Sequence, residues 1–332
     1  MKTYLLAIGL LLGLNSYADI DTRISDKEVR VVSSTLTPSQ VIERDARQGE
    51  GKVQYFLLKN GTKTPLNLPQ FSYQKSCNAQ GNFHLNLEAK DEKFVIKSRK
   101  VYEIIFNGSC SKSYDLIFEN ESEVGELAII WDIMREASRK FKELGIQESW
   151  NRKITVKWPS NGDYYQWGTV NITKGYQWDV VGHELGHAIY DMGNIGVFGG
   201  GAHRIDECYS HALALSEGWA SFFAAWLKVN LQDEDAKFEY MVKRRAPIQF
   251  ENIPSDVCEG EKNEWRVTGF LWDIIDYHDD QEQMNVTFKK MWEVTKGQNF
   301  KTTKKLAQHL IKNFVDRFDI EAVWLLNFMK PF

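Results

Sequence analysis

Two histidines and two glutamates in this chain have the types and spacing needed to bind and use a metal ion. His183 and His187 lie four residues apart in the run HELGH, and Glu184 follows the first of them. Positions i and i+4 lie on one face of a helix, so both imidazoles can bind the same ion. Neutral imidazole is a good zinc ligand, and Glu184 can lean toward a metal-bound water without binding the metal. The run therefore predicts a zinc site with Glu184 as general base.

Glu217, thirty residues after His187, supplies the third ligand that such a site needs. Catalytic zinc sites use three protein ligands and keep one position open. A five-residue motif also arises by chance, and a histidine pair on a helix can serve packing alone. An acidic residue on a second predicted helix, over residues 210–229, favours the metal site. We expect one zinc ion per chain, bound by His183, His187 and Glu217.

These motifs resemble those of the gluzincin metallopeptidases, the clan of thermolysin and fungalysin. Residues 179–191 (DVVGHELGHAIYD) are similar to the active-site helix of that clan almost throughout. Residues 217–220 (EGWA) are similar to its second helix, most of all in the fungalysin form. The resemblance extends over about residues 154–277. It implies a two-lobed catalytic domain with the zinc in the cleft and a mainly helical C-terminal lobe.

The resemblance also implies which side chains orient the ligands. The clan commonly has an aspartate four residues after the glutamate ligand, which orients the first histidine, and Ser221 stands there in this chain. Asp191 matches the acidic position that follows the second histidine. We expect Asp191 and Ser221 to lie next to the ligands. Weak support of a metal ligand typically lowers metal affinity or activity tenfold or more.

Peptide hydrolysis further needs a donor for the charge that develops on the carbonyl oxygen. The clan uses a histidine or tyrosine from the C-terminal lobe. Residues 263–273 resemble the fungalysin helix that follows the glutamate ligand, and Arg266 falls at its histidine position. A guanidinium stays protonated, so we expect Arg266 to stabilise the oxyanion, with a salt bridge to Glu264 or Asp273 as the alternative. Other candidate donors are His203, Tyr209, His211, Tyr277 and His278, of which His203 and His211 could instead bind a second metal.

Two segments near the zinc motif are candidates for holding the substrate. Residues 154–158 and 167–172 read as short strands. By resemblance, the second is an edge strand on which Gly168, Thr169 and Val170 bind an extended peptide by strand addition. An ordinary edge strand is the alternative. The glycine-rich run 196–202 is either a lid over the cleft or a plain connector.

The residues before about 118 predict a different architecture from those after it. Residues 19–118 alternate short apolar runs with turn signals such as Asn60-Gly61 and Asn107-Gly108. This pattern predicts a small antiparallel β-sandwich, which we interpret as an accessory domain. The catalytic domain is expected over residues 119–332, which gives an α+β fold. Helices are predicted from Glu123 to just before Gly145, and over residues 263–277, 283–294, 303–314 and 319–328.

Composition and the N-terminal residues indicate an exported protein. The chain has 332 residues and a formal net charge of −4 with both signs interspersed, unlike the basic stripe of a nucleic-acid binder. Residues 1–18 predict a secretory signal peptide cleaved after Ala18. Its apolar run is too short to span a bilayer, and no later segment approaches about 20 apolar residues. We therefore expect a periplasmic or secreted protein without stable membrane insertion.

The four cysteines of an exported chain suggest two disulfides, for which three connectivities exist. We favour the local pairs Cys77–Cys110 and Cys208–Cys258, because each falls within one predicted domain. A cysteine–zinc cluster is the rival interpretation, but the chain has no Cys-x-x-Cys spacing.

Together these features predict a secreted zinc endopeptidase that hydrolyses peptide or protein substrates with a metal-activated water. A first alternative is a zinc-stabilised binding module that has lost turnover, although such a module has no chemical need for Glu184. A second is an aminopeptidase, which would dedicate an acidic residue to the substrate amine, and no clear anchor of that kind is present.

Overall fold

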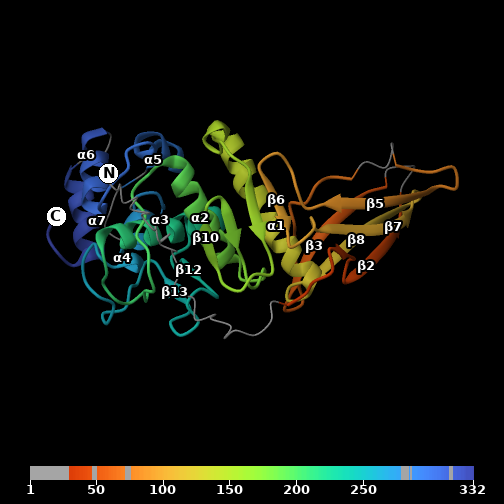
Figure 1. Cartoon of the computed structure of the whole chain (residues 1–332), viewed down its shortest axis with the longest axis horizontal. Helices are drawn as coiled ribbons and strands as arrows, with labels where there is room; N and C mark the ends of the chain where they lie inside the picture. The colour runs from red at the N-terminus through yellow and green to blue at the C-terminus, as the bar shows by residue number, and fades with distance from the viewer. Residues whose placement is uncertain (1–29, 47–50, 72–75, 278–283, 285, 314–316) are drawn as a thin grey trace, which may run out of the picture.

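The computed structural model describes residues 30–46, 51–71, 76–277, 284, 286–313 and 317–332. The predicted signal peptide, residues 1–18, lies outside them. Strands from the first third of the chain occupy one end of an elongated molecule and most helices occupy the other (Figure 1). Helix α1 (Glu123–Glu143) lies between the two ends. Helices and several small sheets thus combine in one chain, which confirms the α+β class.

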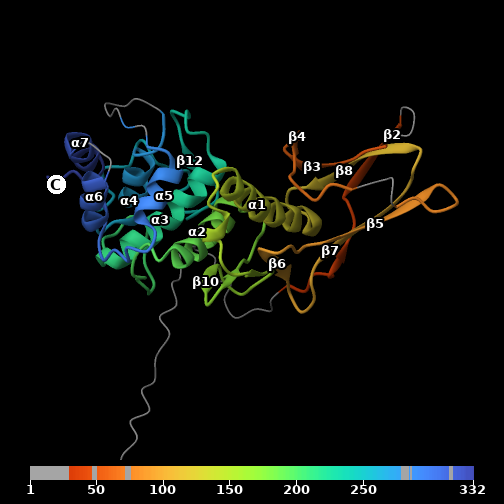
Figure 2. The ribbon, with the colours of Figure 1, turned by 90° about the horizontal axis from the view of Figure 1, so that it is seen from above.

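The N-terminal strands form two layers (Figure 2). Phe83 in one layer and Tyr114 in the other pack with ring centroids 5.8 Å apart. The predicted antiparallel sandwich is confirmed in part: β2 with β8, β3 with β4 and β5 with β7 pair antiparallel, but β3 pairs with β8, and β1 with β7, in parallel. Parallel neighbours need a crossover connection, and the chain between β3 and β8 supplies it by passing through the other layer. One sheet has the order β2-β8-β3-β4 (Gln40–Asp45, Lys112–Glu119, Val53–Lys59, Thr62–Pro65), and the other β1-β7-β5 (Thr35–Leu36, Glu103–Ser109, Asn82–Glu88).

Strand β6 (Phe94–Lys97) leaves these layers and joins the sheet next to the predicted zinc site. It pairs in parallel with β9 (Ile154–Lys157), and Phe94 and Ile96 are fully buried. The predicted division at residue 118 therefore does not coincide with a break in the sheets. This third sheet has the order β10-β11-β9-β6, where β10 is Tyr164–Gln166 and β11 is Thr169–Asn171.

Helix α1 begins and ends where the sequence predicts. The Ser122 hydroxyl caps its first turn by accepting from the Gly125 amide at 3.1 Å, and Gly145 follows its end with φ +69°. Its buried Glu126 accepts hydrogen bonds from the Trp158 indole at 3.1 Å and from the Gly175 amide at 2.7 Å. These bonds anchor the segment that leads into the zinc-motif helix.

Helices α2 (Trp178–Gly193) and α3 (His211–Lys228) pack against each other, and α1, α4 and α6 pack against this pair. The predicted helix over 263–277 ends earlier, at Trp272, and α5 begins at Phe288, where the Thr287 hydroxyl caps it. A short hairpin of β12 (Lys237–Phe238) and β13 (Ile248–Gln249) lies beside them. The C-terminal helices are α4 (Glu264–Trp272), α5 (Phe288–Thr295), α6 (Thr303–Asn313) and α7 (Arg317–Phe328).

Both favoured disulfides, Cys77–Cys110 and Cys208–Cys258, are confirmed. Within the described ranges, no helix has the length and apolar character required to cross a membrane.

Candidate metal centre

Helices α2 and α3 bring the three predicted ligands together. The Nε2 atoms of His183 and His187 lie 3.1 Å apart, and each lies 3.1 Å from Oε2 of Glu217. Ligands bound to zinc at roughly 2.0–2.1 Å in a tetrahedral arrangement lie about 3.3–3.4 Å from one another. All three side chains are buried. The near-equilateral triangle of two imidazole nitrogens and one carboxylate oxygen fits a zinc ion that keeps its fourth position open.

Ser221 fixes which ring nitrogen of His183 carries the proton. Its hydroxyl lies 3.0 Å from Nδ1 of His183 and donates to the sulfur of Met241 at 3.9 Å. A hydroxyl has one proton to donate, so Ser221 accepts from Nδ1–H. The Nε2 lone pair of His183 then faces the other two ligands. Burial lowers the pKa of His183 to about 4, which keeps the imidazole neutral at neutral pH.

Glu217 is charged although it is fully buried. Burial raises its pKa, but the attraction of its charged form to His187 and His203 when these rings are protonated, and its close contacts with His183 and His187, lower the pKa by more. The pKa of Glu217 is therefore well below its usual range. An anionic carboxylate in this position is the state that binds a cation.

Glu184 follows His183 on α2, and its carboxylate is buried. Few hydrogen-bond donors reach this carboxylate. Among the described residues no side chain donates to either oxygen, and the backbone amide of Tyr165 is the one hydrogen-bonding group that lowers its pKa. Burial, and then repulsion by Glu217 and Asp163, raises the pKa of Glu184 well above 4.5. A buried carboxylate without side-chain donors is a site for a water or a cation nearby.

Asp191 does not orient His187, so this prediction is wrong. Its Oδ2 accepts from the Tyr165 hydroxyl at 2.6 Å and also pairs with Arg152. Asp191 lies one turn beyond His187, where α2 passes β10 rather than the metal ligands. The hydrogen bond between Tyr165 and Asp191 holds β10 against α2, which places the Tyr165 backbone beside Glu184.

Gly168, Thr169 and Val170 do not form a sheet edge, which corrects the predicted substrate strand. Thr169 and Val170 belong to β11, which pairs with β10 on one side and with β9 on the other. Gly168, with φ +79°, lies in the turn between β10 and β11. Because both ladders of β11 are occupied, the edge strand on this side of the sheet is β10.

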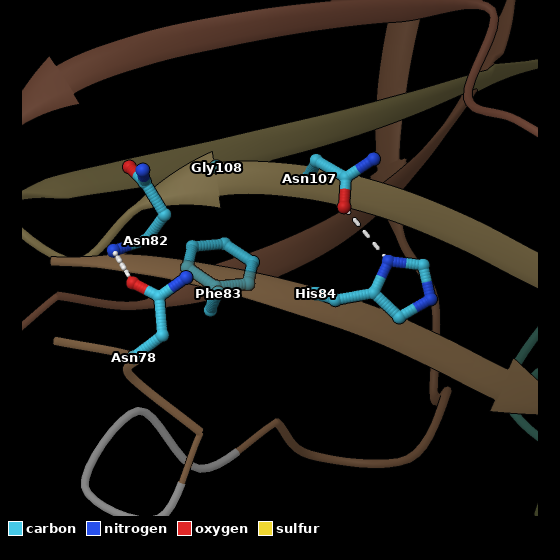
Figure 3. A pocket seen from close by; sticks show the side chains of 6 residues that line it. All are labelled: Asn78, Asn82, Phe83, His84, Asn107 and Gly108. Carbon is cyan, nitrogen blue, oxygen red and sulfur yellow. Dashed lines mark hydrogen bonds between the residues drawn. The ribbon is translucent and has the colours of Figure 1, made fainter. Parts of the chain in front are cut away.

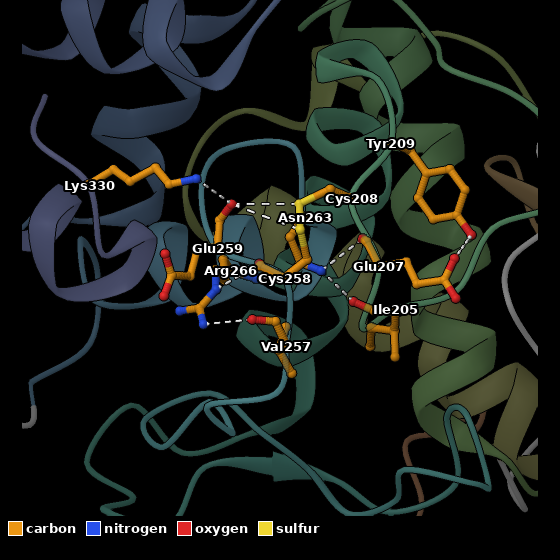
Figure 4. Close-up of a disulfide and its surroundings, with 10 residues drawn as sticks. All are labelled: Ile205, Glu207, Cys208, Tyr209, Val257, Cys258, Glu259, Asn263, Arg266 and Lys330. Atoms are coloured by element: carbon orange, nitrogen blue, oxygen red, sulfur yellow. Dashed lines mark hydrogen bonds between the residues drawn. A yellow bond between two sulfur atoms is a disulfide. The ribbon is translucent and has the colours of Figure 1, made fainter.

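Arg266 serves the fold, because its guanidinium binds backbone beside the Cys208–Cys258 disulfide (Figure 4). Its Nε donates to the Cys258 carbonyl at 2.9 Å, and its two terminal nitrogens donate to the carbonyls of Asn327 at 2.7 Å and Val257 at 3.0 Å. A guanidinium that satisfies three backbone carbonyls is committed to holding these segments together. The predicted oxyanion role of Arg266 is therefore corrected to a structural one.

A second group of buried side chains adjoins the ligands. Nε2 of His203 lies 3.2 Å from Oε2 of Glu264 and 3.8 Å from Oε2 of Glu217. The sequence analysis named His203 as one of several candidate donors and, with His211, as an alternative ligand of a second metal, and it treated Glu264 only as an ion-pair partner. The glycines before His203 are the one local signal that its loop approaches other backbone closely.

Three of the other candidate oxyanion donors belong to the described part of the chain. His211 pairs with Glu261 at 3.4 Å, and the Tyr209 hydroxyl donates to Glu207 at 3.0 Å. Tyr277 is half exposed. His278 lies outside the described residues.

A separate open pocket is lined by residues on and next to β5 and β7 (Figure 3), strands that lie at the end of the molecule away from most helices (Figure 1). Two contacts hold the side chains around the pocket. The Asn78 side chain accepts a hydrogen bond from the Asn82 amide at 2.9 Å, and Nδ1 of His84 lies 2.7 Å from Oδ1 of Asn107. The pocket is lined by Asn78, Asn82, Phe83, His84, Asn107 and Gly108, a set without a carboxylate or a cysteine.

One comparison with known proteins identifies a family, and no curated protein matches the chain. The family described as "Mycolysin C-terminal domain" matches residues 142–316, more than half of the chain. The matched range contains the HELGH run, His203, Glu217 and Glu264. On this evidence, the chain belongs to the Mycolysin C-terminal domain family.

Proposed function

We propose that this protein is a zinc-dependent endopeptidase with a gluzincin-like active site. The observation that carries the proposal is the triangle of 3.1 Å distances among His183, His187 and Glu217. A neutral imidazole pair and an ionised carboxylate are the donor set that catalytic zinc sites use. Membership of the Mycolysin C-terminal domain family supports a protease-related function. The two-lobed arrangement around the zinc is part of the proposal.

Each residue near the ligands has a definite role in this reaction. His183, His187 and Glu217 would hold the zinc, which would lower the pKa of a water to around 7 and so supply the nucleophile. Glu184 accepts the proton of that water through its buried carboxylate and returns it to the leaving amine. Ser221 holds His183 in the Nδ1–H form. Strand β10 presents its backbone beside Glu184 and is the proposed binding edge for an extended peptide, held in place by Asp191.

The proposed setting is outside the cytoplasm. Two disulfides persist in oxidising compartments, and they support export to the periplasm or the medium. We propose that residues 19–118 form an accessory unit and that residues 119–332, together with β6, form the catalytic unit.

Metal analysis combined with an activity assay tests the proposal. The purified protein should contain zinc and cleave unfolded casein, and a chelator should abolish cleavage until zinc is restored. His187→Ala should lose both properties. The matched variant His84→Ala changes a histidine on β5 and should retain both. Zinc-free wild-type protein, or cleavage that survives chelation and His187→Ala, refutes the proposal.

A further inference from the structure

Two groups of possible metal ligands share one carboxylate. His183, His187 and Glu217 form the first, and His203, Glu217 and Glu264 form the second. In each group the ligand atoms all lie within 4.8 Å of one another, and every member is buried. His203 and Glu264 of the second group are not ligands of the zinc site proposed above.

The protonation of His203 directs a lone pair at the carboxylates. Its Nδ1 lies 3.0 Å from the Gly201 carbonyl oxygen, which can only accept, so Nδ1 carries a proton. Nε2 faces Glu264 at 3.2 Å and Glu217 at 3.8 Å. A nitrogen lone pair and two carboxylate oxygens repel one another unless a cation lies between them. That cation is either a proton on Nε2 or a metal ion.

Glu217 has an oxygen available for a second ion. Its Oε2 contacts both histidines of the first group, whereas no described residue donates a hydrogen bond to Oε1, which is buried. A proton on Nε2 of His203 would satisfy a single hydrogen bond. A metal ion would instead bind several ligands from separate segments of the chain. In two-metal hydrolases the two ions lie roughly 3.5–4 Å apart.

Asn263 and the Cys208–Cys258 disulfide join the two segments that carry His203 and Glu264 (Figure 4). Asn263 caps α4 by accepting from the Arg266 amide at 2.9 Å. The same side chain donates to the carbonyls of Ile205 at 2.8 Å and Glu207 at 3.0 Å. The Cys208–Cys258 disulfide joins the two segments covalently. The loop that carries His203 is therefore tied to the helix start that carries Glu264.

We propose that His203, Glu264 and Glu217 form a second site for a divalent transition-metal ion, with Glu217 shared between the two ions. One imidazole and two carboxylates suit zinc or manganese. The proposal rests on the proposed zinc site only through the sharing of Glu217. A second ion would place positive charge beside the first, a charge that Arg266 does not supply.

Metal counting under controlled zinc concentration tests this site. Wild-type protein is equilibrated with zinc and a weak chelator that removes loosely bound ions, and its zinc is measured by mass spectrometry. We expect two zinc ions per chain, and one in His203→Ala and in Glu264→Gln. Glu264→Gln keeps the side-chain shape, so it tests the ligand if His203→Ala fails to fold. Circular dichroism verifies that each variant is folded.

His211→Ala is the matched control, because His211 also pairs with a glutamate in this region but lies outside both groups. It should keep two ions. One ion in the wild type, with no loss in His203→Ala and Glu264→Gln, overturns the second site, assigns a proton to Nε2 and leaves the proposed function intact. A wild type without bound zinc overturns both proposals. Repeating the titration with manganese determines which ion the second site prefers.

Discussion

Gly186 of α2 lies directly against Ala220 of α3. A Cβ atom at Gly186 would come within 2.6 Å of the Ala220 carbonyl oxygen, and one at Gly182 within 2.9 Å of the Ala224 Cβ. Without side chains at these positions, the two helices approach closely enough for His183 and His187 to reach Glu217. Gly182 and Gly186 of α2 therefore face α3.

Gly186→Ala should therefore loosen the helix pair. The added methyl group meets backbone, which shifts only with the whole helix, so we expect a loss of about 1–3 kcal/mol in the free energy of unfolding. Zinc affinity should fall with it. Denaturant unfolding and metal titration measure both quantities. Gly162→Ala, whose Cβ would make an ordinary 3.5 Å contact with Tyr164, is the control. Equal stability of the two variants would contradict the close-packing argument.

Glu184→Gln should separate zinc binding from catalysis. The amide has the same shape but cannot accept a proton, so zinc content should remain while casein cleavage falls by about 10²–10⁴-fold. Glu207→Gln, on the exposed surface, should leave both unchanged. Near-normal cleavage by Glu184→Gln would refute its role as the base.

Zinc should stay bound in moderately acidic solution. A proton competes with the metal for Nε2 of His183, and burial lowers the pKa of that imidazole to about 4. Zinc content should thus remain full at about pH 5.5 and fall as the pH approaches about 4. A zinc-sensitive dye monitors release, and circular dichroism separates it from unfolding. Half-release near pH 6.5, the ordinary histidine value, would contradict the expected shift.

Ser221→Ala should weaken zinc binding while preserving the fold. The substitution removes the acceptor of the His183 Nδ1 proton, so the imidazole is held less firmly in its ligand form. We expect zinc affinity to fall about tenfold. Competition with a chelator measures it. Ser221→Thr retains the hydroxyl and should keep affinity nearer to that of the wild type. Unchanged affinity in Ser221→Ala would show that the hydrogen bond has no influence on the metal.

Arg266→Met should lower stability rather than catalysis. Two buried carbonyls and one half-buried carbonyl lose their charged donor, and we expect a loss of about 3 kcal/mol in unfolding free energy. The value of kcat per folded molecule should stay close to that of the wild type. Arg204→Met breaks only an exposed ion pair and should cost less than about 1 kcal/mol. A large drop in kcat with unchanged stability would restore the oxyanion role to Arg266.

Local periodicity accounts for what the sequence predicts correctly. The four-residue spacing of His183 and His187 determines that both lie on one helix face, whatever surrounds the helix. Helix α1 follows from its apolar repeat, the Ser122 cap and Gly145. Both disulfide pairs follow from cysteines that lie in the same part of the chain.

Local sequence patterns do not predict features that depend on contacts between distant segments. The parallel pairing of β3 with β8 depends on a crossover that strand patterns do not encode. The edge position of β10 and the contact between Asp191 and Tyr165 both depend on how a hairpin packs on α2.

The sequence by itself determined the chemistry of the candidate zinc site, because helix geometry alone brings His183 and His187 together and leaves Glu184 beside them. Tertiary structure decided the surroundings. His203 and Glu264 lie in separate segments, and they meet because Asn263 and the Cys208–Cys258 disulfide join a loop to a helix start. Arg266 became a structural residue for the same reason: the carbonyls that its guanidinium satisfies come from two distant parts of the chain. Contacts of this range depend on the packing of the whole fold.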